Sequence, residues 1–439
     1  MKKLIITCSI LFTTLSFAQD KKWSLEECVD YALENNISVQ QAQNTLLINE
    51  QDVKAAKGNF LPSLGAGANH NLSIGNAQIY AGAFVDRTDH RTNLNIRANQ
   101  TIFNGFRNLN LKKQSILNLE TNEYDLARIK DDISLNVVNA YLNVLFNKEN
   151  IATAQAQYDF SEKQLNQVQE LVDAGVQPKA NVYDAEATLA SDKQAITTAQ
   201  NNYDLALLSL SQLLQLPYKG FDVAIMDVDM PSSTLLYNNV APILNYAYEN
   251  RSEIKLSEKN IENARIATEI SKSGFYPSLT GSYSYGSSTF YSSSTDDEAS
   301  FIDQIDDQKA HQFALSLDIP IFSRFANKTA VAKSKIQEEN AQLNYEQQKL
   351  NLESDIQRAF ADAKAAFNSY EAANESLEAQ MLAFNNSKER YDIGAMSTYD
   401  LEQARVRLIN AKNSLTNAKY DFVFKTKVLD FYAGKSLID

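Results

Sequence analysis

The sequence predicts a mainly α-helical chain that carries two β-hairpins. Its 439 residues include only 13 glycines and 7 prolines, and these fall between six long tracts that contain neither residue. Segments of the first half recur in the second half at a nearly constant spacing. Two stretches in each half alternate apolar and polar residues with the period of a β-strand. Together the three observations indicate a tandem duplication of one structural plan.

The six tracts predict long helices, because proline removes a backbone donor and glycine weakens a helix. At 1.5 Å per residue, the tract of residues 106–174 forms a helix of about 100 Å if it is continuous. Short turns at 175–178 and 394–397 predict that the following helices fold back as antiparallel hairpins. The tracts are residues 24–57, 106–174, 179–216, 243–273, 326–393 and 395–433.

Short sequence matches define the repeat. Residues 31–35 (YALEN) recur as 246–250 (YAYEN), and 60–64 (FLPSL) recur as 275–279 (FYPSL) with the same offset. We therefore expect two repeats, each with a first helix, a β-hairpin and a helical hairpin. The expected boundaries are 19–220 for the first repeat, 221–240 for a linker, 241–439 for the second repeat, about 61–103 and 275–322 for the β-hairpins, and 106–216 and 326–433 for the helical hairpins.

Alternation of period two predicts the strands. One face of residues 64–74 is mostly apolar. The same alternation occurs in residues 93–103 and in the corresponding two stretches of the second half. Such strands fit a half-buried sheet or the lipid-facing wall of a membrane barrel. Four strands cannot close a water-filled barrel, so the barrel interpretation requires several chains. Residues 75–90 and 286–309 are expected to be long polar loops. The apolar face of the first strand holds Leu64, Ala66, Ala68, His70, Leu72 and Ile74.

The predicted helices carry heptad seams, in which spacings of three and four residues alternate. The seams are rich in alanine, which predicts close helix packing. One member of the seam in residues 179–216 is charged, namely Asp192. That seam consists of Val182, Ala185, Leu189, Asp192, Ile196, Ala199, Tyr203, Ala206, Leu210 and Leu213.

The beginning of the chain predicts export. Residues 1–18 have two lysines, an apolar stretch and a small-x-small ending at Ala18, as in a signal peptide. Only Cys28 remains after cleavage, which excludes an intramolecular disulfide and a cysteine-based metal site. The three histidines are too scattered for a zinc motif. A net charge of −13 argues against nucleic acid as a partner.

The duplicated order of elements, the helix at 32–36 (ALENN), the Pro-Ser-Leu strand entries and the turn glycines resemble the TolC family of outer-membrane efflux proteins. The resemblance covers residues 23–435. It implies a TolC-like homotrimer in the outer membrane of a Gram-negative bacterium, with a shared β-barrel and a long periplasmic barrel of coiled-coil helices. It also implies a passive duct with no catalytic activity and no cofactor. The implied partners are a periplasmic adaptor (membrane fusion) protein, an inner-membrane RND or ABC transporter and outer-membrane lipid.

The resemblance also locates candidate sites. Residues 391–403 match the segment that closes the family's channel with rings of acidic side chains; Asp400 occupies the first ring position and Gln403 the second, so one acidic ring is absent. Tyr391 keeps the family's tyrosine, whereas Met396 and Asn181 replace a basic residue and its acidic partner. Asp400 also follows Ser397 by three residues, so it fits the start of a helix equally well. The implied adaptor-docking residues are Gly175, Val176, Gly394 and Ala395.

Two other functions stay open on the sequence. The outlet of a type I protein secretion system has the same architecture as a drug or metal efflux channel. A periplasmic coiled-coil scaffold explains the heptads but leaves the four alternating strands without a purpose. A secreted hydrolase that uses paired carboxylates is disfavoured, because the acids lie on helical faces without an aromatic-lined cleft.

Overall fold

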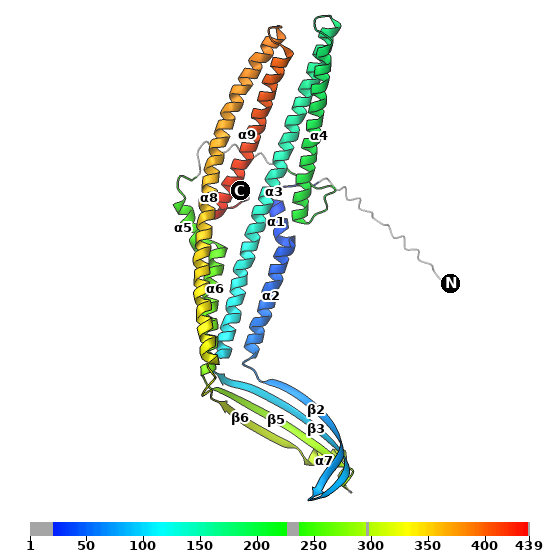
Figure 1. The fold of residues 1–439 in the computed structure, drawn as a ribbon, viewed down its shortest axis with the longest axis vertical. Helices are drawn as coiled ribbons and strands as arrows, with labels where there is room; N and C mark the ends of the chain where they lie inside the picture. The colour runs from blue at the N-terminus through cyan, green and yellow to red at the C-terminus, as the bar shows by residue number, and fades with distance from the viewer. Residues whose placement is uncertain (1–20, 226–236, 296–297, 438–439) are drawn as a thin grey trace, which may run out of the picture. The chain divides into compact units, whose positions relative to one another are not determined.

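A computed structural model describes residues 21–225, 237–295 and 298–437 (Figure 1). The expected signal peptide and part of the expected linker lie outside the described residues. The contacts divide the chain into two compact units. Unit 1 comprises the described parts of Met1–Gln40, Arg128–Arg251 and Asn351–Asp439, and unit 2 comprises Gln41–Ala127 and Ser252–Leu350. Each unit therefore takes segments from both halves of the sequence.

The element order is repeated between the halves. Helices α3 and α8 have 67 residues each, and α4 and α9 have 35 each. The first half contains β1 (Lys22–Trp23), α1 (Leu25–Asn35), α2 (Ile37–Gly58), β2 (Ser63–Tyr80), β3 (Ala83–Asn104), α3 (Arg107–Asp173) and α4 (Ala180–Leu214). The second contains β4 (Asp222–Val223), α5 (Ala241–Asn250), α6 (Ser252–Lys272), the 3-10 turn η1 (Ser273–Phe275), β5 (Ser278–Ser292), α7 (Phe301–Asp307), β6 (Ala310–Asp318), α8 (Ala326–Asp392) and α9 (Thr398–Tyr432).

The first helix of each half is broken, where the sequence predicted continuous helices over 24–57 and 243–273. Asn36 and Arg251 adopt extended backbone conformations between α1 and α2 and between α5 and α6. The side chain of Asn36 accepts a hydrogen bond from Ser38 N at 2.9 Å and so starts α2. Such a break contains neither glycine nor proline, which is why the tract boundaries did not reveal it.

The sheet of unit 2 has the antiparallel order β2-β3-β5-β6 (Figure 1). The expected loop at 75–90 is wrong: β2 and β3 continue to a tight turn at Gly82, whose φ is +84°. Hydrogen bonds between strand backbones do not require apolar side chains, so β2 and β3 continue past the residues in which apolar and polar side chains alternate. The expected loop at 286–309 is also wrong in part, because β5 extends to Ser292 and α7 packs against it.

One face of this sheet exposes large apolar side chains. Leu64, Ile74, Phe313 and Leu315 are each about three-quarters exposed to solvent in the single chain. An apolar surface of this kind marks a contact with lipid or with another protein. Among the helices of the described residues, none is both long and apolar enough to cross a membrane.

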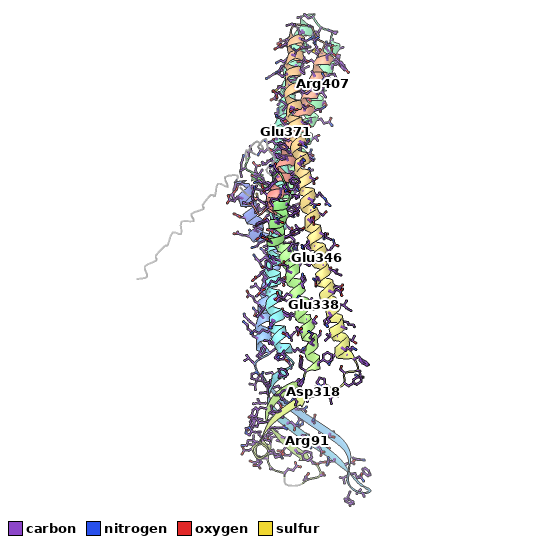
Figure 2. The ribbon with its side chains drawn as sticks, turned by 90° about the vertical axis from the view of Figure 1, so that its left-hand side faces the viewer. Arg91, Asp318, Glu338, Glu346, Glu371 and Arg407 are labelled. Carbon is purple, nitrogen blue, oxygen red and sulfur yellow. The ribbon has the colours of Figure 1, made fainter. Side chains whose placement is uncertain are left out.

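The helices of unit 2 are joined by polar contacts. Glu338 of α8 (Figure 2) accepts a hydrogen bond from Thr268 of α6 at 3.3 Å and pairs with Arg265 at 3.4 Å. Lys259 of α6 pairs with Glu120 of α3 at 2.8 Å. The helices of unit 2 are therefore held together partly by charged and hydroxyl side chains.

The apolar core of unit 1 lies around Tyr141 of α3. Its ring is fully buried, and its hydroxyl lies 2.8 Å from Ala224 O and 3.2 Å from Trp23 O. Burial raises the pKa of this phenol. Because β1 and β4 pair in parallel at Lys22↔Asp222, the hydroxyl ties α3 to both short strands. The segment before α1 is thereby fixed to the segment after α4.

Replacing Tyr141 with Phe deletes this hydroxyl but keeps the ring. A buried carbonyl then loses its donor, so we expect the free energy of unfolding to fall by about 1–3 kcal/mol. Urea unfolding followed by circular dichroism measures the change. Tyr183→Phe is the control, because that side chain is exposed and we expect a change within about 0.5 kcal/mol. Equal effects of the two substitutions contradict a structural role for the Tyr141 hydroxyl.

Candidate functional site

The candidate site lies where the two helical hairpins of unit 1 turn. Gly175 follows α3 and Gly394 follows α8, with φ values of +75° and +76°. Val176 N donates to Leu171 O, and Ala395 N donates to Arg390 O, each at 2.8 Å. Only glycine adopts this left-handed conformation at little cost, so these turns explain the two glycines.

Exposed apolar side chains surround the turns. Val176, Ile393 and Tyr399 are each at least two-thirds exposed. Apolar side chains that stay exposed at a hairpin end are typical of a surface that contacts another protein. Val176 is one of the four residues that the family resemblance suggests for adaptor docking, and Ile393 directly precedes another of them, Gly394.

The residues expected at the gate lie in different environments. Asp400 is exposed at the start of α9, where its N–H donates to Ser397 Oγ at 3.1 Å and its carboxylate accepts from the same hydroxyl at 2.7 Å. Gln403 is exposed, and Asn181 donates to Gln177 Oε1 at 3.1 Å. Tyr391 is buried, and its hydroxyl has no hydrogen-bond partner among the described residues. The structure therefore gives Asp400 a helix-starting role.

A buried ion pair that the sequence did not predict connects the two helical hairpins. Nη1 of Arg405 on α9 lies 2.9 Å from Asp192 Oδ2 on α4 and 3.0 Å from Ser161 Oγ on α3. Nε of Arg405 donates to Glu402 Oε2 at 2.7 Å. The Ser161 hydroxyl donates to the same oxygen of Asp192. We call Ser161, Asp192, Glu402 and Arg405 the polar clamp.

The buried charges of the polar clamp are each paired with a charge of opposite sign. Arg405, Asp192 and Ser161 are each less than one-tenth exposed. Burial lowers the pKa of the Arg405 guanidinium, but hydrogen bonds and charge from Glu402 and Asp192 outweigh this effect, so the pKa lies above its usual value. The arginine is therefore always charged. One feature of the sequence could have indicated the clamp: Asp192 occupies a position of the heptad seam, and a carboxylate buried there needs a partner of opposite charge.

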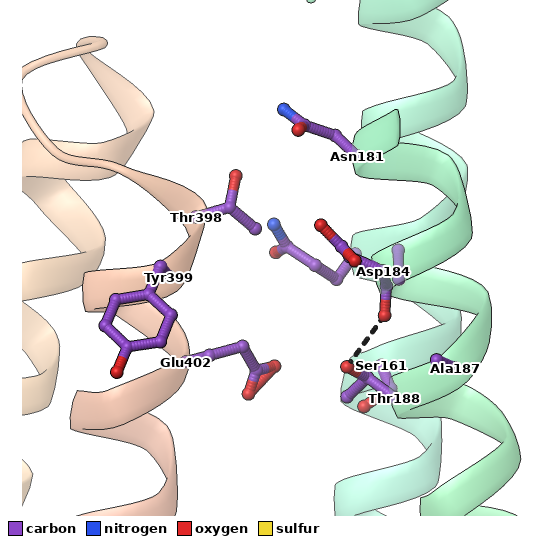
Figure 3. A pocket seen from close by; sticks show the side chains of 10 residues that line it. Ser161, Asn181, Asp184, Ala187, Thr188, Thr398, Tyr399 and Glu402 are labelled. Atoms are coloured by element: carbon purple, nitrogen blue, oxygen red, sulfur yellow. Dashed lines mark hydrogen bonds between the residues drawn. The ribbon is translucent and has the colours of Figure 1, made fainter. Parts of the chain in front are cut away.

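A cavity of about 330 Å³ adjoins the clamp (Figure 3). Thr398, Tyr399 and Glu402 of α9 line one side, and residues of α3 and α4 line the other. Ser161 and Glu402 of the polar clamp are among its lining residues, so the cavity lies directly against the clamp. Its remaining lining residues are Ser161, Gln164, Asn181, Asp184, Ala185, Ala187 and Thr188.

Comparison with known proteins identifies the family of the chain, and the matched residues include both helical hairpins. The family model described as outer membrane efflux protein matches residues 28–215 and 243–434. The chain belongs to the outer membrane efflux protein family. Both matched segments contain one helical hairpin, so the family's signature covers each half. None of the curated proteins compared matches the chain.

Solved structures of outer-membrane channels share the fold of this family member. VceC of Vibrio cholerae is 17% identical, with a TM-score of 0.77 over 94% of this chain and 96% of VceC. CmeC of Campylobacter jejuni is 20% identical, with a TM-score of 0.75 over 94% and 86% of the two chains. CusC is 17% identical, with a TM-score of 0.79 over 94% and 92%.

The family and the fold confirm three predictions from the sequence. The chain is a TolC-like outer-membrane efflux protein, it is mainly helical with a small sheet, and it resides in the outer membrane. Proteins of this family and fold are channels and not enzymes. The predicted site residues stay predictions.

Removing Arg405 tests the clamp. Arg405→Met leaves the Asp192 carboxylate buried without its counter-charge, so we expect the free energy of unfolding to fall by about 3–5 kcal/mol. Adding Asp192→Leu removes the stranded charge and restores most of that loss. Lys425→Met is the control: it breaks an ion pair with Asp421 that is more exposed, for a loss below about 1 kcal/mol. If urea unfolding gives Arg405→Met and Lys425→Met the same loss of unfolding free energy, the result contradicts a buried clamp.

Removing the hydroxyl of Tyr391 is expected to have little effect on stability, in contrast to the removal of Arg405. Because its buried hydroxyl has no partner among the described residues, Tyr391→Phe changes the free energy of unfolding by less than about 1 kcal/mol. Single-channel conductance also stays unchanged. A loss of stability above that value, or a clear change in conductance, shows that the hydroxyl has a partner in the assembled channel.

Proposed function

We propose that three copies of the chain form one passive duct, which carries solutes from an inner-membrane RND or ABC transporter and its periplasmic adaptor to the outside. The observation that supports it most is the open sheet. Strands β2 and β6 each have a free edge, and one face is apolar. Within hydrocarbon every edge N–H and C=O needs a partner, which neighbouring copies supply by closing the sheet.

The turns of the helical hairpins are the proposed gate and docking site. Gly175, Val176, Gly394 and Ala395 present an exposed, partly apolar surface that suits an adaptor. The hydrogen bonds between Ser397 and Asp400 hold the carboxylate at the first residues of α9. Three such carboxylates around one axis attract cations and repel anions. Helix start and selectivity ring are thus compatible roles for Asp400.

The polar clamp gives the gate a rigid base. Because it joins α3 and α4 to α9 within one chain, it opposes separation of the two helical hairpins below their turns. The cavity beside it is also lined by Asn181, Thr398 and Tyr399, so these side chains near the turns have room to move. We infer that opening involves the hairpin ends and leaves the clamp closed.

Single-channel recording tests the proposed duct. Protein extracted from outer membranes in detergent is added to a planar bilayer, and discrete conductance steps with a preference for cations are expected. In Asp400→Asn, which keeps an acceptor for Ser397, the reversal potential in a salt gradient shifts toward zero because three ring charges are lost. Asp173→Asn, at the end of α3, is the matched control and keeps the wild-type value.

Two results contradict the proposal. Protein that leaves the membrane without detergent and never inserts into the bilayer is not a channel. An equal shift in Asp173→Asn and Asp400→Asn shows that general surface charge, and not a ring at Asp400, sets the ion preference.

A further inference from the structure

All three histidines of the sequence lie on the sheet of unit 2, and two of them face each other. The register pairs Leu72 with His90 and His70 with Thr92. His70, His90 and Thr92 therefore lie on the same face as diagonal and direct neighbours. Both histidine side chains are exposed.

The distance between the two imidazoles suits a shared metal ion. Nε2 of His70 lies 3.4 Å from Nδ1 of His90, which is long for a hydrogen bond. Two nitrogens bound to one tetrahedral metal at 2.0–2.1 Å lie about 3.3–3.4 Å apart. The unbound geometry thus already matches that of a two-histidine chelate.

Thr92 selects the ligating nitrogen. Its Oγ1 lies 2.9 Å from Nδ1 of His70. When Nδ1 donates its proton to this hydroxyl, Nε2 keeps its lone pair, which is directed toward His90. A hydrogen bond to the outer nitrogen of a metal-binding histidine commonly fixes both the ring orientation and the tautomer.

The neighbouring charges do not oppose a cation. Arg91 lies between His90 and Thr92 in β3 (Figure 2), but the period of two directs its side chain to the other face. There its guanidinium lies 5.4 Å from the ring of Phe290. Arg87 on that same face pairs with Asp89 at 2.6 Å. The histidine pair itself contacts no charged side chain through a hydrogen bond or ion pair within the described ranges.

The pair also lies outside the part of the sheet where all four strands run together. That part ends at the row formed by Gly67, Asn95, Gly286 and Ala310. His70 and His90 follow beyond this row, on the longer strands β2 and β3.

We propose that His70 and His90 chelate one divalent transition-metal ion of the Zn²⁺, Ni²⁺ or Cu²⁺ class, with Thr92 as the positioning residue. The described residues hold no group of three or more histidine, cysteine or carboxylate side chains suited to a metal. Water therefore completes the coordination, and the ion exchanges readily. This inference requires only the folded sheet and does not depend on efflux.

Titration with Cu²⁺ tests the proposal, because copper binds such sites most tightly of these ions and has a diagnostic spectrum. The detergent-purified full chain, made without a histidine tag, is expected to bind one Cu²⁺ per chain. Electron paramagnetic resonance then shows coupling to two imidazole nitrogens. His70→Asn and His90→Asn each remove the two-nitrogen signature, and Thr92→Val weakens binding about 10-fold or more while keeping both ligands.

His311→Asn is the matched control. His311 lies on the same sheet, but its Nδ1 pairs with the Tyr283 hydroxyl at 2.9 Å, so this substitution leaves Cu²⁺ binding unchanged. Circular dichroism verifies that all variants are folded. Copper binding that persists in His70→Asn and His90→Asn, a signal from only one imidazole, or no saturable binding in the wild type each overturn the proposal.

Discussion

The rest of this structure depends on the need of every strand edge for hydrogen-bond partners. Unit 2 presents an open sheet in which β2 has 18 residues and β6 has 9. Beyond β6 the chain satisfies part of the β5 edge itself: Gln304 accepts from Phe290 N at 2.7 Å, and Glu298 accepts from Ser292 N at 2.8 Å. Within the described residues, the outer edges of β2 and β6 pair with no further strand. A sheet that is apolar on one face and unpaired at its edges offers those edges to the strands of another chain, as the proposed function requires.

In unit 1 the long helices pack against each other largely through small side chains. Alanine-rich seams let helices approach closely but bury little apolar area for each residue. Aromatic contacts add specific fixed points, such as Phe160 with Phe384 and Phe367 with Phe422 at centroid distances of 5.7 and 5.4 Å. The polar clamp adds a contact that is satisfied in one register only. Such a pair is costly to break, because removing either partner leaves an uncompensated buried charge.

Some residues were predictable because their role is local. The glycines at 175 and 394 were expected at tight turns, and both have positive φ. Ser397 three residues before Asp400 predicted a helix start, and the hydrogen bonds between them are present. The heptad spacing identified Val182, Ala185 and Leu210, which are buried. Each of these signals depends on neighbours within a few positions along the chain.

Other features depended on partners far away in the sequence. The length of β2 and β3 was underestimated, because strand pairing persisted where the side-chain alternation had ceased. Asp192 was recognised as a member of the seam, but its partner Arg405 lies on another hairpin and could not be assigned. The three histidines were judged too scattered for a zinc motif, and only the register of β2 against β3 brings the ring nitrogens of His70 and His90 together.

The sequence by itself therefore determined the fold class, the duplicated order of elements and the positions of the hairpin turns. These follow from backbone chemistry and from periodicity, which act over short stretches of chain. Only the tertiary structure decided which charges are paired, how far the sheet extends and which side chains converge on one point. Those outcomes are set by strand register and helix packing, because a single shift of register changes every contact across an interface.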